Sequence, residues 1–232
     1  MHIFSLITHA FRERLRFALV TLLFFILVRG FLLEAFTIPT SSMENTLLVG
    51  DFLLVNKALY GAEVPGTRLR LPAIREPRRG EVVVFRPPHD PARNYVKRVV
   101  AVPGDTVAMR EKTLHVNGVP LEEEYALYRQ ARGDAFHPGM AWQSGFLAAA
   151  RPRLRYVPSR DNWGSLVVPP GKYFVLGDNR DNSEDSRYWG FVAREEIHGR
   201  PWLIYLSVER GEASAAAWLG KVRWRRLGHR VQ

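Results

Sequence analysis

The hydrophobic positions of this 232-residue chain form one long run near the N-terminus and several short runs after it. The long run is uninterrupted only over residues 17–28. A helix needs about 20 residues to cross the hydrocarbon core of a bilayer, so a membrane span has to extend past Arg29 and Glu34. Both charged side chains can lie near the membrane surface. We therefore predict a transmembrane anchor over residues 16–35.

A cleaved signal peptide is the alternative to an anchor, because a basic start and a short apolar stretch also describe one. The run is followed by Arg-Gly and Phe-Leu-Leu instead of a small-x-small cleavage site, which favours the anchor. Before the run, Arg12, Arg14 and Arg16 are opposed only by Glu13. The positive-inside rule then places residues 1–15 in the cytoplasm and everything after about residue 36 outside.

Beyond the anchor, short apolar runs separated by turn residues predict a mainly β domain over residues 36–232. Strands are expected at 51–57, 80–85, 95–102, 114–116 and 172–176. Asn117-Gly118 predicts a hairpin with a primed turn. Helical periodicity is confined to 41–48, 194–197 and 213–221.

Many short strands with turn signals are typical of an antiparallel β-barrel or a sandwich-like body. Residues 121–170 carry proline, glycine and scattered charges, and we expect them to be irregular. They indicate a smaller inserted β and loop subdomain, which we assign to residues 106–170.

Composition adds two constraints. The chain contains no cysteine, which excludes disulfides, thiol catalysis and cysteine-based metal sites. The net charge of +10 predicts a polyanionic neighbour, and the membrane segment favours anionic lipid over nucleic acid. The C-terminal arginines either contact such lipid or belong to a solvated tail; they are Arg223, Arg225, Arg226 and Arg230.

Ser42 lies a few residues beyond the apolar run, next to Thr40 and Ser41. A serine at the membrane surface could act on membrane-inserted segments, provided that the chain supplies a base. Of the seven histidines, His2 and His9 precede the span, and none of the others has an obvious Asp or Glu orienter nearby in sequence. A Ser-His-Asp triad is recognised by geometry, so it is unsupported but not excluded. No HExxH-type spacing indicates a metal site.

Lys97 is the other candidate base, because Ser-Lys dyads also exist. It lies in an apolar run in which Tyr95, Lys97 and Val99 share one face of a strand. Burial in such a strand can lower the pKa of a lysine by several units, as a base requires. Taken alone, this pattern favours a surface lysine on an edge strand over a base at Lys97, and a solvent-exposed or ion-paired side chain at Arg98.

The segment 177–190 follows a strand and concentrates turn formers, hydroxyls and charges of both signs. The spacing from Asp178 or Asp181 does not match a calcium loop. The alternatives are a solvated loop tied by Asx-turns and a loop made rigid by internal Asp–Arg pairs.

Together, three segments resemble bacterial type I signal peptidases, also called leader peptidases, which are Ser-Lys endopeptidases. Residues 38–51 (IPTSSMENTLLVGD) resemble the nucleophile box of that family, residues 95–105 (YVKRVVAVPGD) its lysine box, and residues 177–190 (GDNRDNSEDSRYWG) its last signature box. The resemblance runs from about Arg29 to Ile204 and is weakest at 121–170.

The resemblance implies Ser42 as nucleophile and Lys97 as general base. The Ser42 N–H and the Thr40 hydroxyl would hold the oxyanion. Ser183 would hydrogen bond to the Lys97 amine and orient it, and Asp185 would pair with Arg187 and brace the loop.

The resemblance also implies where the substrate binds. An extended substrate would add a strand alongside residues 95–97 and 37–40. Ile38 and Val96, with Met43 and Tyr95, would line small pockets that accept alanine at positions −1 and −3.

The function implied by the resemblance is removal of N-terminal signal peptides from exported pre-proteins after Ala-x-Ala sites, without cofactor or metal. The enzyme would be a monomer in the bacterial inner membrane. It would have a cytoplasmic N-terminus and a periplasmic catalytic domain, and it would contact signal peptides and phospholipid but no nucleic acid. The chain departs from the family pattern at Ser41, where glycine is usual, and at Asn45, where proline is usual. It also lacks the second span and the disulfide of many Gram-negative relatives.

Two rival functions remain open at this point. One is a narrower Ser-Lys peptidase, such as a pilin-processing enzyme or a relative of self-cleaving repressors. The other is a non-enzymatic, basic, membrane-anchored binding protein.

Overall fold

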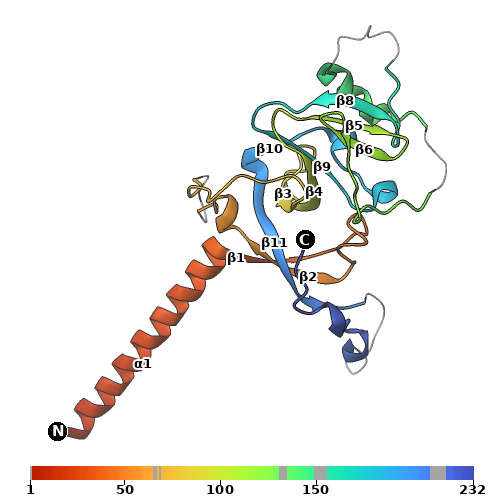
Figure 1. Ribbon diagram of the computed structural model, residues 1–232. Helices are drawn as coiled ribbons and strands as arrows, with labels where there is room; N and C mark the ends of the chain where they lie inside the picture. Colours follow the sequence, from red (N-terminus) through yellow and green to blue (C-terminus); the bar gives the residue numbers. More distant parts are fainter. Residues whose placement is uncertain (1, 65–66, 68, 131–134, 149–155, 210–217) are drawn as a thin grey trace.

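The computed structural model describes residues 2–64, 67, 69–130, 135–148, 156–209 and 218–232. One long helix, α1 (His2–Leu27), continues through a short π-helix (Val28–Leu32) directly into strand β1 (Leu33–Thr37). Two antiparallel sheets follow, and they confirm the expected mainly β architecture. Figure 1 shows α1 projecting from the body that these sheets form.

The larger sheet has seven strands in the order β1-β2-β11-β3-β4-β9-β10. Its remaining members are β2 (Asp51–Asn56), β3 (Val82–Phe85), β4 (Tyr95–Ala101), β9 (Lys172–Leu176), β10 (Val192–Ala193) and β11 (Ile197–Ser207). The long β11 pairs with β3 near its start and with β2 over the rest, with register shifts in both pairings. It thereby joins the strands that carry residues 33–56 to those that carry residues 82–101.

The smaller sheet has the order β7-β6-β5-β8 and lies between β4 and β9 in the chain. It consists of β5 (Thr106–Arg110), β6 (Thr113–Val116), β7 (Val119–Pro120) and β8 (Trp163–Val167). Asn117 and Gly118 have φ values of 54° and 80°, as the predicted primed turn requires. Apolar residues of this sheet, among them Val107 and Leu166, pack with Phe174 and Leu176 of β9 in one buried cluster.

The short helices surround the sheets. They are α2 (Ser186–Trp189) and the 3₁₀ helices Ala58–Tyr60, Pro138–Phe146, Arg180–Asn182, Arg194–Glu196, Trp218–Lys221 and Trp224–Arg226.

Several predicted elements differ in the structure. The helix expected over 41–48 is wrong, because these residues form consecutive turns. The helix expected over 194–197 is a 3₁₀ turn that leads into β11. Of the helix expected over 213–221, residues 213–217 lie outside the described residues and 218–221 are a 3₁₀ helix. The expectation that 121–170 is irregular is wrong over residues 163–167, which form β8.

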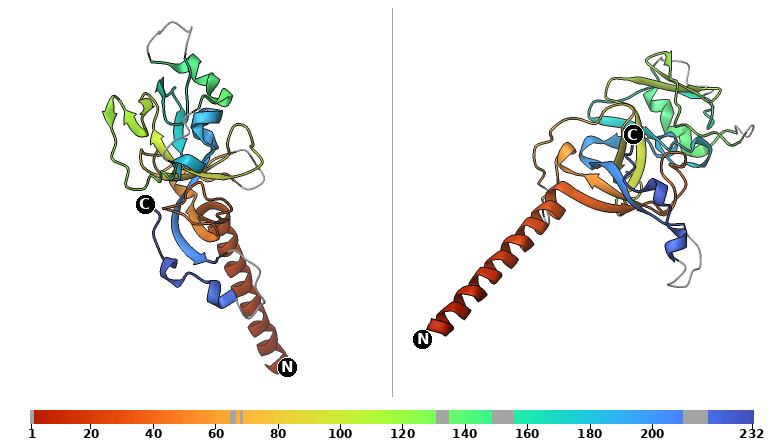
Figure 2. Two further views of the ribbon diagram at one scale, coloured as in Figure 1. Left: turned by 90° about the vertical axis from the view of Figure 1, so that its right-hand side faces the viewer. Right: turned by 60° about the horizontal axis from the view of Figure 1, so that its bottom comes forward.

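The segment from Arg12 to Leu32 is helical and is long and apolar enough to cross a membrane. Its apolar window is not buried against the rest of the chain, and Figure 2 shows the helix standing clear of the sheets. The sheet begins where this helix ends, because the Lys57 N–H donates to the Leu32 carbonyl (2.9 Å) and its amine donates to the Arg29 carbonyl (3.1 Å). The last three residues of the predicted anchor, 33–35, therefore belong to β1.

Candidate active site

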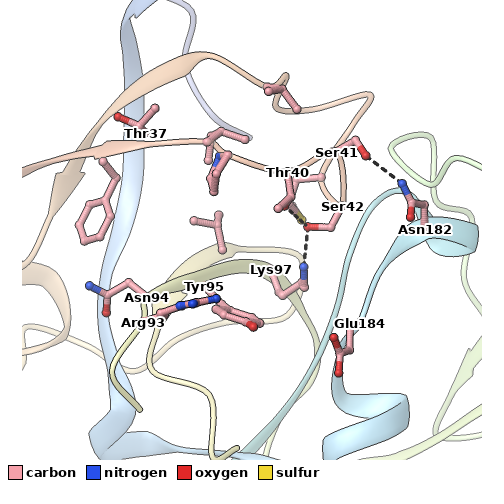
Figure 3. Close-up of a pocket in the computed structure, with 16 residues that line it drawn as sticks. Thr37, Thr40, Ser41, Ser42, Arg93, Asn94, Tyr95, Lys97, Asn182 and Glu184 are labelled. Atoms are coloured by element: carbon pink, nitrogen blue, oxygen red, sulfur yellow. Dashed lines mark hydrogen bonds between the residues drawn. The ribbon is translucent and has the colours of Figure 1, made fainter. Parts of the chain in front are cut away.

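A cavity of about 580 Å³ opens between the end of β1 and the start of β4. It is lined by residues 36–43, Val49, residues 93–97, Asn182 and Glu184. Figure 3 shows Ser42 and Lys97 facing each other in this cleft. The structure thus brings together the three segments that the sequence singled out.

The position of Ser42 is fixed by the loop that joins β1 to β2. This loop is closed by hydrogen bonds from Ile38 N to Asp51 O (2.9 Å) and from Gly50 N to Ile38 O (3.0 Å). Met43, which is 1% exposed, and Leu47 anchor the loop in the core cluster of β2 and β3. Ser42 itself remains partly exposed to the cleft.

The loop over 177–190 also contacts the loop between β1 and β2, at residues 41–42, which we call the serine turn. Asn179 N donates to the Ser42 carbonyl (3.1 Å) and the Asn179 amide donates to the Ser41 carbonyl (3.2 Å). Asn182 donates to the Ser41 hydroxyl (2.8 Å). These contacts make the loop a support for the serine turn rather than a freely solvated segment.

Lys97 is the partner of Ser42. Its amine lies 2.6 Å from the Ser42 hydroxyl oxygen, and only 4% of the residue is exposed. Burial lowers the pKa of Lys97 to about 8, against a smaller opposing effect of the Asp185 carboxylate. A lysine with this pKa has an appreciable neutral fraction near pH 7 and can accept a proton from the serine. The alternative of a surface lysine is therefore wrong.

Two hydrogen-bond donors lie beside the serine oxygen. The Thr40 hydroxyl is exposed to the cleft and lies 3.4 Å from the Ser42 hydroxyl. The Ser42 N–H donates to none of the residues that the structure describes. Both donors are thus available to a negatively charged oxygen that forms at the serine.

Asp185 and Arg187 form the predicted ion pair, and both are fully buried. Arg187 Nε lies 2.8 Å from Asp185 Oδ1, and Arg187 Nη2 lies 2.8 Å from Asp185 Oδ2. The second of these oxygens also accepts a hydrogen bond from Gly177 N (3.0 Å). Burial alone would raise the pKa of Asp185, but the neighbouring Arg187 guanidinium outweighs it and keeps that pKa below its usual value. The pair ties the two ends of the loop together.

The predicted hydrogen bond between Ser183 and Lys97 is not formed. The Ser183 hydroxyl is buried and has no hydrogen-bond partner among the described residues. It lies above Gly177, where a Cβ would come within 2.2 Å of it and within 2.5 Å of the Ser42 carbonyl. The absence of a side chain at Gly177 lets the loop approach the serine turn this closely, and the hydroxyl points into that contact rather than to the amine.

Apolar side chains form the walls of the cleft. Ile38 and Met43 are buried, while Tyr95 and Val96 are half-buried at its edge. Figure 3 shows Thr37 and Asn94 on one side of the dyad and Asn182 and Glu184 on the other, with Tyr95 below Lys97. Apolar walls of this kind can bury apolar side chains of a ligand.

Arg98 is neither exposed nor paired at a surface. Its guanidinium makes two hydrogen bonds of 2.8 and 2.6 Å to Asp178, and both side chains are buried. Since Arg98 follows the lysine and Asp178 begins the loop, this pair connects β4 to the support of the serine turn. The sequence indicated that Arg98 could be paired but did not identify its partner.

The C-terminal arginines have a role that the sequence did not indicate. Arg226 donates to both oxygens of the buried Asp51, at 3.1 and 2.6 Å, and to the Thr46 carbonyl at 3.0 Å. Arg223 donates to the Val49 carbonyl (2.6 Å). Neither of the two alternatives, lipid contact or a solvated tail, describes these two side chains, because they hold the end of the serine loop.

Other kinds of catalytic centre find no support in the described part of the chain. Histidine side chains there make no hydrogen bond to Ser42; His89, for example, packs against the rings of Tyr95 and Trp189. Within the described ranges, no group of three or more His, Asp or Glu residues could hold a metal ion.

Comparison with known proteins gives matches over most of the chain. A family model described as signal peptidase, peptidase S26, matches residues 11–206. Signal peptidase I of Pseudomonas aeruginosa is 41% identical over 208 residues, which are 80% of this chain and 69% of that protein. Signal peptidase I of Aquifex aeolicus is 36% identical over 213 residues, or 78% of each chain. A crystal structure of a signal peptidase I from Enterococcus faecalis is 32% identical, with 55% of this chain and 98% of that chain covered and a TM-score of 0.37.

Proposed function

Since this chain belongs to the signal peptidase family, peptidase S26, we propose that it cleaves its substrates with Ser42 as nucleophile and Lys97 as general base. The chain is accordingly a serine endopeptidase that removes signal peptides from pre-proteins. The observation that carries the proposed dyad is the 2.6 Å contact between the Ser42 hydroxyl and a buried lysine whose pKa burial lowers.

The proposed reaction starts with a neutral Lys97 amine. The amine removes the Ser42 proton as the serine oxygen forms a bond to the scissile carbonyl carbon. The developing oxyanion accepts hydrogen bonds from the Ser42 N–H and the Thr40 hydroxyl. The protonated amine then donates its proton to the leaving nitrogen as the C–N bond breaks, and an ester to Ser42 remains.

The second half repeats the proton transfer with water. Neutral Lys97 removes a proton from a water molecule that attacks the ester, and the amine returns that proton to the Ser42 oxygen as the signal peptide leaves. No metal or cofactor takes part in either half. The low exposure of the lysine is required in both halves because an ammonium ion cannot act as the base.

We propose that the signal peptide lies extended along residues 95–97 and 37–40, and adds a strand to them. Its −1 and −3 side chains would enter the pockets at Ile38, Met43, Tyr95 and Val96. These pockets are bounded by the buried Ile38 and Met43 and the half-buried Tyr95 and Val96, and such apolar walls suit the alanines of an Ala-x-Ala site.

The apolar helix and the family indicate a membrane-anchored enzyme. We propose the plasma membrane of a bacterium, a cytoplasmic N-terminus and a catalytic domain outside. This orientation follows from Arg12, Arg14 and Arg16 before the apolar run. The exposed surface near Phe36 would contact the outer leaflet, and the enzyme would act as a monomer.

The test is in vitro cleavage of a pre-protein with an Ala-x-Ala site, followed by N-terminal sequencing of the product. Ser42→Ala and Lys97→Ala are each expected to abolish cleavage, and Lys97→Arg should fail too because arginine does not deprotonate. Wild-type activity should fall on the acid side of about pH 8 as Lys97 becomes protonated. Normal processing by any of the three variants, or a flat profile down to mildly acidic pH, would contradict the dyad.

A further inference from the structure

One end of the cleft carries a charged side chain that the proposed reaction does not use. Glu184 lines the cavity, is exposed to solvent and forms no hydrogen bond or ion pair with any described residue. The resemblance to the family assigns roles to its neighbours Ser183 and Asp185 but none to Glu184. An unpaired carboxylate in a cleft is available to interact with whatever passes it.

The expected course of the substrate puts Glu184 beside the residues that follow the scissile bond. We call this side of the cleft the leaving side, because the cleaved mature protein departs from it. Thr37 and Asn94, each next in the chain to a residue of the proposed −1 and −3 pockets, lie on one side of Ser42, whereas Asn182 and Glu184 lie on the other (Figure 3). An extended peptide passes the nucleophile once. If the residues before the scissile bond occupy the −1 and −3 pockets, the residues after that bond leave past Asn182 and Glu184.

The charges around the cleft are unevenly distributed. Arg93 also lines it, but on the side of the −1 and −3 pockets, and lies 3.5 Å from Asp90. Asn182 is neutral and already donates to Ser41. Glu184 is therefore the charged side chain that faces the leaving side of the cavity, and its negative charge also acts on the amine of Lys97.

We propose that Glu184 sets a charge preference for the first residues of the mature protein, favouring Lys or Arg and disfavouring Asp or Glu at positions +1 and +2. This preference rests on the function proposed above. A cationic substrate residue would pair with Glu184, and an acidic one would be repelled by it at short range. Because the carboxylate is exposed and screened by salt, we expect a preference of about three- to tenfold in kcat/KM at low ionic strength.

The experiment uses the full chain in detergent or proteoliposomes and one pre-protein with an Ala-x-Ala site. Lys, Gln and Glu are placed in turn at +1, at +2 and, as a positional control, at −2. The wild type is expected to cleave the Lys substrates fastest and the Glu substrates slowest at +1 or +2. Glu184→Gln should abolish this order, and Glu184→Lys should reverse it, whereas Glu122→Gln, at an exposed acid outside the cavity, should preserve it.

A second readout separates a charge effect from a local change of shape. Removing the carboxylate should move the acid limb of the pH–rate profile to lower pH, because Glu184 raises the pKa of Lys97. Glu184→Asp should restore both the substrate order and the position of that limb, at least in part.

The outcomes distinguish this inference from the proposed function. If cleavage depends on Ser42 but is equal for the Lys and Glu substrates, or if Glu184→Gln keeps the wild-type order, the preference is refuted and the dyad stands. A charge preference confined to −2 refutes the placement of Glu184 on the leaving side. If cleavage does not depend on Ser42, both ideas fail together.

Discussion

Replacing Lys97 by methionine should make the protein more stable near neutral pH while abolishing its activity. Lys97 is buried, and burial lowers its pKa from 10.5 to about 8. Each pH unit between these values corresponds to about 1.4 kcal/mol. Below pH 8, holding a protonated lysine at this site therefore costs about 3 kcal/mol relative to the unfolded chain. Methionine has no such cost, and the lost hydrogen bond to Ser42 offsets about 1 kcal/mol of the gain.

The direction in which stability changes with pH follows from the number of protons that the folded and the unfolded chain bind. Between pH 8 and 10.5 the folded protein has released the Lys97 proton, whereas the unfolded chain still holds it. Stability therefore rises with pH across this window, by about 1.4 kcal/mol per pH unit from this group. Above 10.5 the lysine is neutral in both states and its cost is gone.

The assay is denaturant unfolding of the full chain in detergent at pH values from 7 to 9.5, with the wild type and Lys97→Met compared at each pH. The difference should be about 2 kcal/mol in favour of methionine at pH 7 and should shrink as the pH rises. Lys172→Met, at a partly exposed lysine at the start of β9, serves as the control and should not reproduce this pattern. A pH-independent difference, or a variant less stable than the wild type at pH 7, would refute the argument that burial depresses the lysine pKa.

Two further substitutions test the supports of the serine turn. Gly177→Ala would place a Cβ 2.5 Å from the Ser42 carbonyl oxygen, so we expect kcat to fall by about 100-fold because the nucleophile shifts; an unchanged kcat would mean that the turn tolerates the displacement. Arg226→Ala leaves the buried Asp51 without its closest cation and should lower the free energy of unfolding by about 2 kcal/mol. The exposed Arg225→Ala is the matched control, and equal effects of the two arginine variants would contradict a specific role for the ion pair.

The sequence predicted those parts of the fold that have a local signal. The strands at 95–101 and 172–176 are continuous apolar runs bounded by turn residues, and they are found where expected. Strand β11 was missed because Gly199, Arg200 and Pro201 interrupt its apolar pattern, and its pairing is irregular at register shifts. Strand β1 was missed because its residues continue the apolar run of the helix.

In the candidate site, too, residues with a local sequence signal could be predicted and contacts between distant residues could not. Ser42 and Lys97 could be identified because each lies in a motif, and the structure brings them within hydrogen-bond distance. The supports of the serine turn could not, since they depend on contacts between distant parts of the chain. Asp51 and Arg226 are 175 residues apart, and nothing near either residue indicates the other. The contact of Ser183 was predicted wrongly for the same reason, because it depends on how closely Gly177 approaches the serine turn.

The pairing of Asp51 with Arg223 and Arg226 also imposes an order on the maturation of the enzyme. In the orientation proposed above, the serine turn would leave the membrane first, directly after the helix, whereas the cations that pair with its buried carboxylate, Arg223 and Arg226, follow strand β11 in the chain. A chain in the course of such an export would have its nucleophile outside before the turn that holds it is complete. The protease would then become competent only after both arginines had been exported, which limits premature cleavage.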